Sequence, residues 1–323
     1  MATDGLLIVD KPEGITSLGV VREVKRRFCV RKVGHIGTLD PFATGVLPIV
    51  INEGTKLVPF LEVEPKDYEV VMKLGEETTT DDLTGKVVFR KPWEELTPGV
   101  IHDAFGTFLG KTHQIPPMFS AIKVQGKPLY RLARKGIEVE RKEREVEIFS
   151  IQIEKVDLPE IHFRISCSKG TYIRSLGRDI GRKIGCGAHL LRLRRVRSGP
   201  FTLDQAISWG RLNELSGAEN LLPRLIPLKE AVSSLPQVIG DEQLIKRIRF
   251  GQGMAVRDLS SQALPDFEKG QWLRMCSPKE GLVAILRSEV KGVDIRWASP
   301  EILALRPLRI FHPQKPLQNE GHV

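Results

Sequence analysis

The sequence has few cysteines, and their arrangement suggests neither a disulfide framework nor a metal centre. Cys29, Cys167, Cys186 and Cys276 are widely spaced and form no CxxC pair. Widely spaced thiols are typical of a reducing compartment. Cys186 and His189 form one C-x-x-H pair, but a zinc site needs further soft ligands and no second pair lies nearby. We therefore expect no metal.

Long apolar runs and a glycine-rich phosphate loop are also missing. The apolar run Leu6 to Val9 is too short for a signal peptide or a membrane span, and Asp10, Lys11 and Pro12 follow it. We therefore expect a cytoplasmic protein without membrane contact. The lack of a Gly-rich strand-to-helix loop argues against a Rossmann-type nucleotide enzyme. No heptad pattern requires a dimer, and we expect a monomer.

Positive charge is abundant instead. The chain has 49 Lys and Arg against 40 Asp and Glu, a net charge of +9. Clustered cations interleaved with glycines and aromatic residues favour binding to a polyanion such as RNA, although charge alone is also compatible with a solvated face. The clusters lie at Arg26 to Lys32, Lys123 to Arg144 and Arg192 to Arg197.

The densest local pattern surrounds one acid. The segment Gly34 to Pro48, GHIGTLDPFATGVLP, sets Asp40 among three glycines, two prolines and one histidine. Gly34 and Gly37 allow a positive φ or the close approach of another backbone, and Pro41 fixes the conformation after the acid. An ordinary Asp-Pro is most often an acid that caps its own turn. So much backbone constraint around one carboxylate indicates a built site.

This segment resembles the catalytic motif of the TruB-type pseudouridine synthases, in which the aspartate of a GHxGTLDPxAxGxLP pattern is the nucleophile. By this resemblance Asp40 is the catalytic residue. Further blocks follow in the family's order and cover about the first two-thirds of the chain. They are GLLIVDKPEGITS from Gly5, KDYEVVMKLGEETTTDD from Lys66, QIPPMFSAIKVQGKPLYRLARKG from Gln114, CSKGTYIRSLGRDIG from Cys167 and GAHLLRLRRVRSGPF from Gly187.

The resemblance implies further site residues. Arg174, in KGTYIRS, matches the family's arginine beside the aspartate. Such a cation is expected, because burial raises the pKa of a carboxyl and a planar guanidinium can hold the ionised form by two contacts. Tyr68 is implied to stack on the target uridine or to act near it in proton transfer. The implied substrate-binding residues are His35, which fills the space left by flipped bases, Tyr172 and Leu193, which line the pocket, and Lys11 and Lys169; Lys56 and Asp82 have supporting roles.

Pseudouridine formation cuts the N-glycosidic bond of uridine, rotates the base and joins its C5 to the same sugar carbon. The resemblance implies no cofactor. The carboxylate could add to the pyrimidine, attack the sugar carbon or abstract a sugar proton, and the residues leave these three mechanisms open. The resemblance further implies a stand-alone enzyme that flips out and isomerises uridine 55 in the T-stem-loop of tRNA, without a guide RNA. A guide-dependent enzyme of the dyskerin type and a non-catalytic RNA chaperone are the alternatives.

The alternation of strand-like and helical segments predicts an α+β fold. The resemblance sharpens this to a mixed central sheet of the pseudouridine synthase type, with the cleft across its face. We expect strands at Leu6 to Val9, Val46 to Ile51, Tyr68 to Leu74, Val146 to Ile153, His162 to Cys167, Gly281 to Arg287 and Val293 to Trp297. We expect helices at Leu18 to Phe28 with Ser17 as N-cap, Thr97 to Leu109, Tyr172 to Ile184 and Leu203 to Leu215.

The sequence also predicts a domain division. Residues 1–236 form the catalytic domain, and within it the basic segment 117–145 resembles the family's thumb, which closes over RNA. Phe119 departs from the family, which often has tyrosine there, so stacking survives but a phenolic hydrogen bond does not. Residues 237–312 weakly resemble a PUA domain, a small β-barrel that binds RNA. Residues 313–323 are expected to be a flexible tail.

Overall fold

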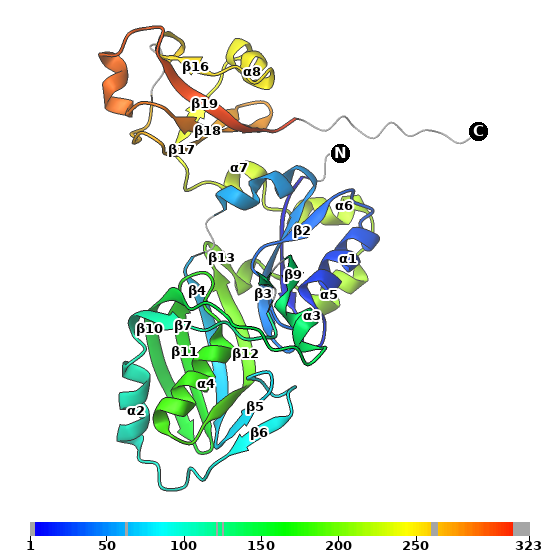
Figure 1. Ribbon diagram of the computed structural model, residues 1–323. Helices are drawn as coiled ribbons and strands as arrows, with labels where there is room; N and C mark the ends of the chain where they lie inside the picture. The colour runs from blue at the N-terminus through cyan, green and yellow to red at the C-terminus, as the bar shows by residue number, and fades with distance from the viewer. Residues whose placement is uncertain (1–3, 62–63, 121, 125, 260–263, 313–323) are drawn as a thin grey trace, which may run out of the picture.

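A large mixed sheet carries the first part of the chain and a smaller curled sheet the last part (Figure 1). The structure, a computed structural model, describes residues 4–61, 64–120, 122–124, 126–259 and 264–312, so the predicted tail lies outside the described residues. The mixed sheet has ten strands in the order β14-β1-β3-β12-β4-β11-β10-β7, with β2 beside β3 and β13 beside β12. The strands are β1 Gly5–Lys11, β2 Val33–His35, β3 Thr44–Ile51, β4 Lys66–Leu74, β7 Gly110–Gln114, β10 Arg144–Asp157, β11 Glu160–Cys167, β12 Ala188–Ser198, β13 Phe201–Thr202 and β14 Ile207–Ser208.

The centre of this sheet joins two of the sequence blocks. Strands β3 and β12 pair in parallel, with Gly45 opposite Arg195, whereas β12 and β4 pair antiparallel. At Gly45 φ is +103°, and a Cβ atom there would lie 2.1 Å from the carbonyl oxygen of Arg195. Only glycine fits such a contact. The strand that follows the Asp40 loop is therefore fixed directly against β12.

Helices pack against the mixed sheet, and two of them begin near the Asp40 loop. Helix α4, Ile173–Ile184, contacts both β12 and α2, Pro98–Gly106. It packs closely because a Cβ atom at Gly181 would lie 2.4 Å from Ala188. Helix α1, Ser17–Arg27, begins one residue earlier than expected: Thr16 is its N-cap and accepts a hydrogen bond from the Gly19 amide.

Two expectations about secondary structure were wrong. Residues 203–215 form a short 3₁₀ turn, the edge strand β14 and the short helix α5, Trp209–Glu214, rather than one helix. The segment Val293–Trp297 is not a strand: it overlaps η5, a 3₁₀ helix at Gly292–Arg296. Its apolar alternation is misleading, because Ile295 is buried while Val293 and Trp297 are exposed.

The smaller sheet has five strands in the order β15-β17-β18-β19-β16 and curls into a half-barrel, in agreement with the expected small β-barrel fold. Its strand β17 contacts η1, Asn52–Phe60, the 3₁₀ helix that follows β3 of the mixed sheet. The ring centroids of Phe60 and Trp272 are 5.0 Å apart there. One apolar cluster includes residues of both parts, so the boundary at residue 236 stays a prediction. The elements are β15 Gln237–Ile239, α8 Glu242–Arg249, β16 Met254–Ala255, β17 Trp272–Ser277, β18 Gly281–Ser288 and β19 Leu303–Ile310.

The basic segment 117–145 contributes little to either sheet. Its described elements are the two-residue strands β8, Lys123–Val124, and β9, Lys127–Pro128, the single helical turn α3, Leu129–Ala133, and the first two residues of β10. The hairpin of β8 and β9 forms a separate two-stranded sheet. The role of this segment as a thumb stays a prediction.

Candidate active site

The structure brings Asp40 and Arg174 together. Asp40 lies on the loop between β2 and β3, and Arg174 is the second residue of α4. The arginine donates from Nε to Oδ2 at 2.8 Å and from Nη2 to Oδ1 at 3.1 Å. The arginine side chain is 3% exposed, whereas the aspartate side chain is 33% exposed. A buried guanidinium thus orients a carboxylate that remains accessible from outside.

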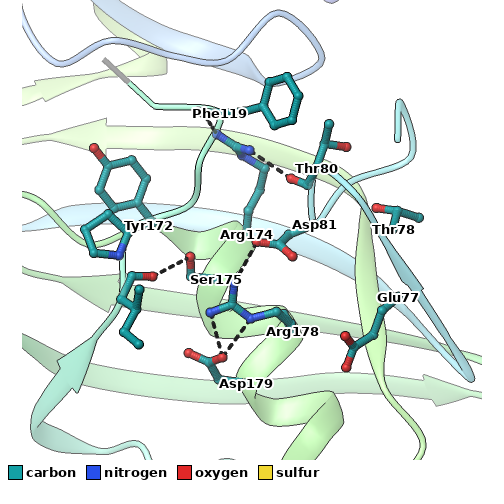
Figure 2. Close-up of polar contacts among 12 residues, drawn as sticks. Glu77, Thr78, Thr80, Asp81, Phe119, Tyr172, Arg174, Ser175, Arg178 and Asp179 are labelled. Atoms are coloured by element: carbon teal, nitrogen blue, oxygen red, sulfur yellow. Dashed lines mark hydrogen bonds and ion pairs between the residues drawn. The ribbon is translucent and has the colours of Figure 1, made fainter. Parts of the chain in front are cut away.

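Two backbone carbonyls and a second acid hold Arg174 in place. Figure 2 shows the guanidinium between Thr80 and Phe119. Nη1 donates to the Thr80 carbonyl at 2.8 Å, and Nη2 donates to the Phe119 carbonyl at 2.7 Å. The Oδ2 atom of buried Asp82 lies 3.7 Å from Nε. Because these contacts surround the guanidinium, it has one position relative to Asp40.

Two further arginines on α4 support this arrangement. Arg178 donates to Asp81 Oδ2 at 3.1 Å and to Asp179 Oδ1 at 2.9 Å (Figure 2). Arg182 makes two contacts with Glu77, at 2.7 and 2.8 Å. Burial raises the pKa of Asp81, and Arg178 opposes that shift. The turn that supplies the Thr80 carbonyl is therefore attached to α4 by arginines spaced one helical turn apart.

The N-terminal block holds the Asp40 loop from the other side. Ser17 Oγ donates to the Leu39 carbonyl at 3.0 Å and accepts from the Leu39 amide at 2.9 Å. Lys11 Nζ donates to the Pro41 carbonyl at 3.1 Å and to two carbonyls of its own loop. The prediction that Lys11 binds substrate needs correction: its side chain is fully buried, so it fixes the loop instead. Burial lowers the pKa of Lys11 to about 8.

A pocket of about 240 Å³ opens above the ion pair. The predicted residues Tyr68, Tyr172 and Leu193 line it together with Asp40 and Arg174. Burial raises the pKa of Tyr68 to about 12, so its hydroxyl group stays protonated at neutral pH. A pocket with aromatic and aliphatic walls and one accessible carboxylate suits a flat, uncharged ring. The other lining residues are Gly37, Thr38, Leu39, Lys66, Ser120, Gly170, Thr171 and Ile173.

His35 and Lys169 lie at the edge of this pocket rather than in its wall. His35 Nε2 is 3.1 Å from Thr38 Oγ1, and burial followed by the charge of Arg195 lowers the pKa of His35. The Lys169 side chain is 74% exposed and pairs with Glu64 at 3.3 Å.

Three residues of the site were not predicted from the sequence. Gln114 accepts from the Tyr172 amide at 2.7 Å and donates to its carbonyl at 2.9 Å. Arg195 is fully buried and donates to the carbonyls of Gly37 at 2.7 Å and Val46 at 2.8 Å, so this part of the basic run Arg192 to Arg197 cannot bind RNA. Lys66 lines the pocket. Strand alternation could have revealed Lys66 and Arg195, which are two residues from Tyr68 and Leu193.

The described residues offer neither a metal centre nor a membrane span. Within the ranges that the structure describes, no three His, Cys, Asp or Glu side chains are grouped so that they could hold a metal ion. No helix in those ranges is long and apolar enough to cross a membrane.

Most of the chain is similar to known proteins. A sequence model of the TruB family pseudouridylate synthase N-terminal domain matches residues 25–173, and one of the tRNA pseudouridylate synthase B C-terminal domain matches residues 174–233. The tRNA pseudouridine synthase B of Geobacter sulfurreducens is 44% identical over 96% of this chain and 100% of its own length. That of Syntrophus aciditrophicus is 42% identical over 96% and 99%. A chain in the crystal structure of a Cbf5-Nop10-Gar1 complex is 26% identical, with a TM-score of 0.71 over 96% of this chain and 86% of that one.

Proposed function

Because the chain belongs to the TruB family of pseudouridine synthases, we propose that it isomerises uridine 55 in the T-loop of tRNA to pseudouridine. The Asp40–Arg174 pair at the pocket carries this proposal, since it offers an oriented, accessible carboxylate where a flat base can enter. Relatives named tRNA pseudouridine synthase B, matched over nearly their full lengths, support tRNA as the substrate.

Asp40 supplies the reactive carboxylate in this proposal. Asp40 lines the pocket and its side chain is 33% exposed, while Arg174 donates to both of its oxygens, so the carboxylate has a fixed orientation and can still be reached from the pocket. Tyr68 lies in the same wall with a neutral hydroxyl group, close to where the base must turn. The net change breaks the bond from N1 to C1′ and makes the bond from C5 to C1′, so no cofactor is consumed.

The target base must leave its stack to reach Asp40. Flipping a nucleotide costs a few kcal/mol, which contacts in the pocket have to offset. Tyr68, Tyr172 and Leu193 offer ring faces and an aliphatic side chain for the flipped base. His35, at the edge, is placed to fill the space that the base leaves.

The enzyme acts alone and as a monomer in the cytoplasm in this proposal, with the segment 117–145 closing over the RNA. The 237–312 module contacts RNA outside the loop. The guide-dependent alternative is the less favoured one, because the relatives matched at 42–44% identity are named tRNA pseudouridine synthase B. A likeness to a complex containing Nop10 and Gar1 is weaker in sequence, at 26% identity.

The test uses purified protein, an unmodified tRNA transcript and an isolated T-stem-loop, with pseudouridine mapped by position. We expect the wild type to modify uridine 55 in both RNAs without a second RNA or protein. Asp40→Asn should abolish turnover and leave tRNA affinity within a few fold, because it preserves shape but removes the carboxylate. Asp204→Asn, at an exposed position, is the matched control. Turnover by Asp40→Asn would contradict the role of Asp40, and a hairpin that reacts only with an added RNA would favour the guide-dependent enzyme.

A further inference from the structure

Lys66 is a pocket residue that the mechanism above does not use. It is the first residue of β4 and lines the same wall as Tyr68, two residues further along the strand. A Cβ atom at Gly37 would lie 3.3 Å from Lys66 Nζ and 3.2 Å from Arg195 Nη1. The ammonium group therefore lies against the loop that carries Asp40, next to a second, buried cation.

Neighbouring acids do not neutralise this ammonium group. Glu64 pairs with Lys169 at 3.3 Å, and Asp67 pairs with Arg197 at 3.2 Å. Among the side chains that the structure describes, none forms an ion pair with Lys66. Placing a half-buried cation in a pocket without a counter-ion costs stability, so the contribution of Lys66 to folding does not explain its position.

The reaction creates a negative charge in this pocket. When the N-glycosidic bond breaks, its electron pair leaves with the base, and the charge spreads over N1, O2 and O4 of the uracil. A fixed cation in a water-poor pocket stabilises such a developing charge more strongly than it stabilises the neutral base. Two cations line the pocket in the described part of the chain, and Arg174 is already bound to Asp40 and two carbonyls. Lys66 is the other.

We propose that Lys66 is a further catalytic residue, whose ammonium group stabilises the negative charge that develops on the uracil as it separates from C1′. The π electrons of the C5–C6 bond then form the bond from C5 to C1′ as the N1 pair moves into the ring, and loss of the C5 proton to solvent with protonation of N1 restores the neutral base. The step thus balances without an oxidant, a reductant or a co-reactant. This inference rests on the proposed function.

The environment of Lys66 also predicts a pH dependence. Burial, followed by the charge of Arg195, lowers the pKa of Lys66 to about 8. The charged form is the active one, so the chemical rate should fall as pH rises through about 8. The other titratable and charged groups near Lys66 are Cys167 on β11, Glu64 and Lys169 in the flanking loops, and Asp40, Tyr68, Tyr172 and Arg174 in the pocket.

The decisive experiment measures the single-turnover rate at saturating tRNA together with the tRNA dissociation constant. Lys66→Met should lower the rate by about 10²–10³-fold, the typical effect of removing one group that stabilises developing charge, and leave the dissociation constant within a few fold. Lys66→Arg, which retains the charge, should recover part of the rate and lose the fall above pH 8. Lys73→Met, at the far end of the same strand, is the control and should behave as wild type.

Folding is checked by thermal unfolding. Because the pKa of Lys66 is lowered in the folded state, its ammonium group opposes folding at neutral pH, and Lys66→Met should melt no lower than wild type. A normal rate in Lys66→Met would overturn the inference. So would weaker tRNA binding with an unchanged rate, which would indicate a contact with an RNA phosphate. If the wild type makes no pseudouridine in tRNA, the proposed function fails; if it does and Lys66→Met matches it, only this inference fails.

Discussion

Two basic segments look alike in the sequence but differ in the structure. The cations of the segment 117–145 that lie between Lys123 and Arg134 are exposed, and none of them forms an ion pair with a described acid. On β12, by contrast, Arg194 makes two contacts with Asp10 at 2.8 and 3.1 Å, and Arg197 pairs with Asp67 at 3.2 Å. Arg195 is fully buried.

The difference follows from where each segment lies. Strand β12 runs through the middle of the mixed sheet, between β3 and β4, so its arginines meet acids and carbonyl groups of neighbouring strands. The hairpin of β8 and β9 lies outside that sheet, where its cations meet solvent. Arg192 is the exposed arginine of β12. Positive charge in the centre of a sheet thus stabilises the fold, while the same charge on an insertion is available to RNA phosphates.

The largest effect should come from Arg195→Met, which removes a cation that serves the fold. The buried carbonyls of Gly37 and Val46 would lose their donor, at about 1–3 kcal/mol each, partly offset because the buried charge is gone. We expect urea unfolding to show a net loss of about 2–4 kcal/mol. Turnover should fall on the order of 10²-fold, because Gly37 lies three residues before Asp40 and a small displacement there misplaces the carboxylate.

Arg192→Met is the matched control for this substitution, since it removes the same group from an exposed position on the same strand. It should change the free energy of unfolding by less than about 0.5 kcal/mol. Equal stability of the two variants would contradict the distinction between the buried and exposed arginines of β12.

The sequence was sufficient to locate Asp40, its loop and the segments that surround it, because these features are local. It was not sufficient to assign the cations, because key partners are distant in the chain: the Pro41 carbonyl is 30 residues from Lys11, and the Gly37 carbonyl is 158 residues from Arg195. Charge clusters report composition, whereas burial depends on which strands become neighbours. Strand alternation does carry part of this information, as Lys66 beside Tyr68 shows.

A smaller but selective effect is expected from the segment 117–145. Replacing Lys123, Lys127, Arg131 and Arg134 by alanine should weaken tRNA binding and flatten its salt dependence, by about 0.7–0.9 in the slope of log K against log salt for each phosphate that is no longer neutralised. Binding titrations at several salt concentrations measure this slope. The chemical rate at saturating tRNA and the free energy of unfolding should stay near wild type, unlike those of Arg195→Met.

The control for this variant exchanges Lys for Arg and Arg for Lys at the same four positions. It keeps the charge, so it should retain the wild-type slope. A slope that the alanine replacements leave unchanged would mean that these exposed cations do not contact RNA phosphates.

The smallest effect is expected when an arginine of β12 that is paired with an acid loses that acid and becomes available to RNA. Asp10→Asn removes the charge that holds Arg194, and both side chains are partly exposed, at 29% and 36%. The cost in stability should therefore be about 0–1 kcal/mol. Arg194 lines an open groove with Arg192 and Leu193, next to the reaction pocket. Once released, its guanidinium can reach a phosphate there, and the salt dependence of T-stem-loop binding should become steeper by up to about 0.9.

The double variant Asp10→Asn with Arg194→Met is the control and should lose that gain. The hydroxyl of Thr44 also lies 3.4 Å from Arg194 Nη1. If Asp10→Asn binds with the wild-type slope, this contact is enough to hold the arginine. The availability of a cation to RNA would then depend on more than its acid partner.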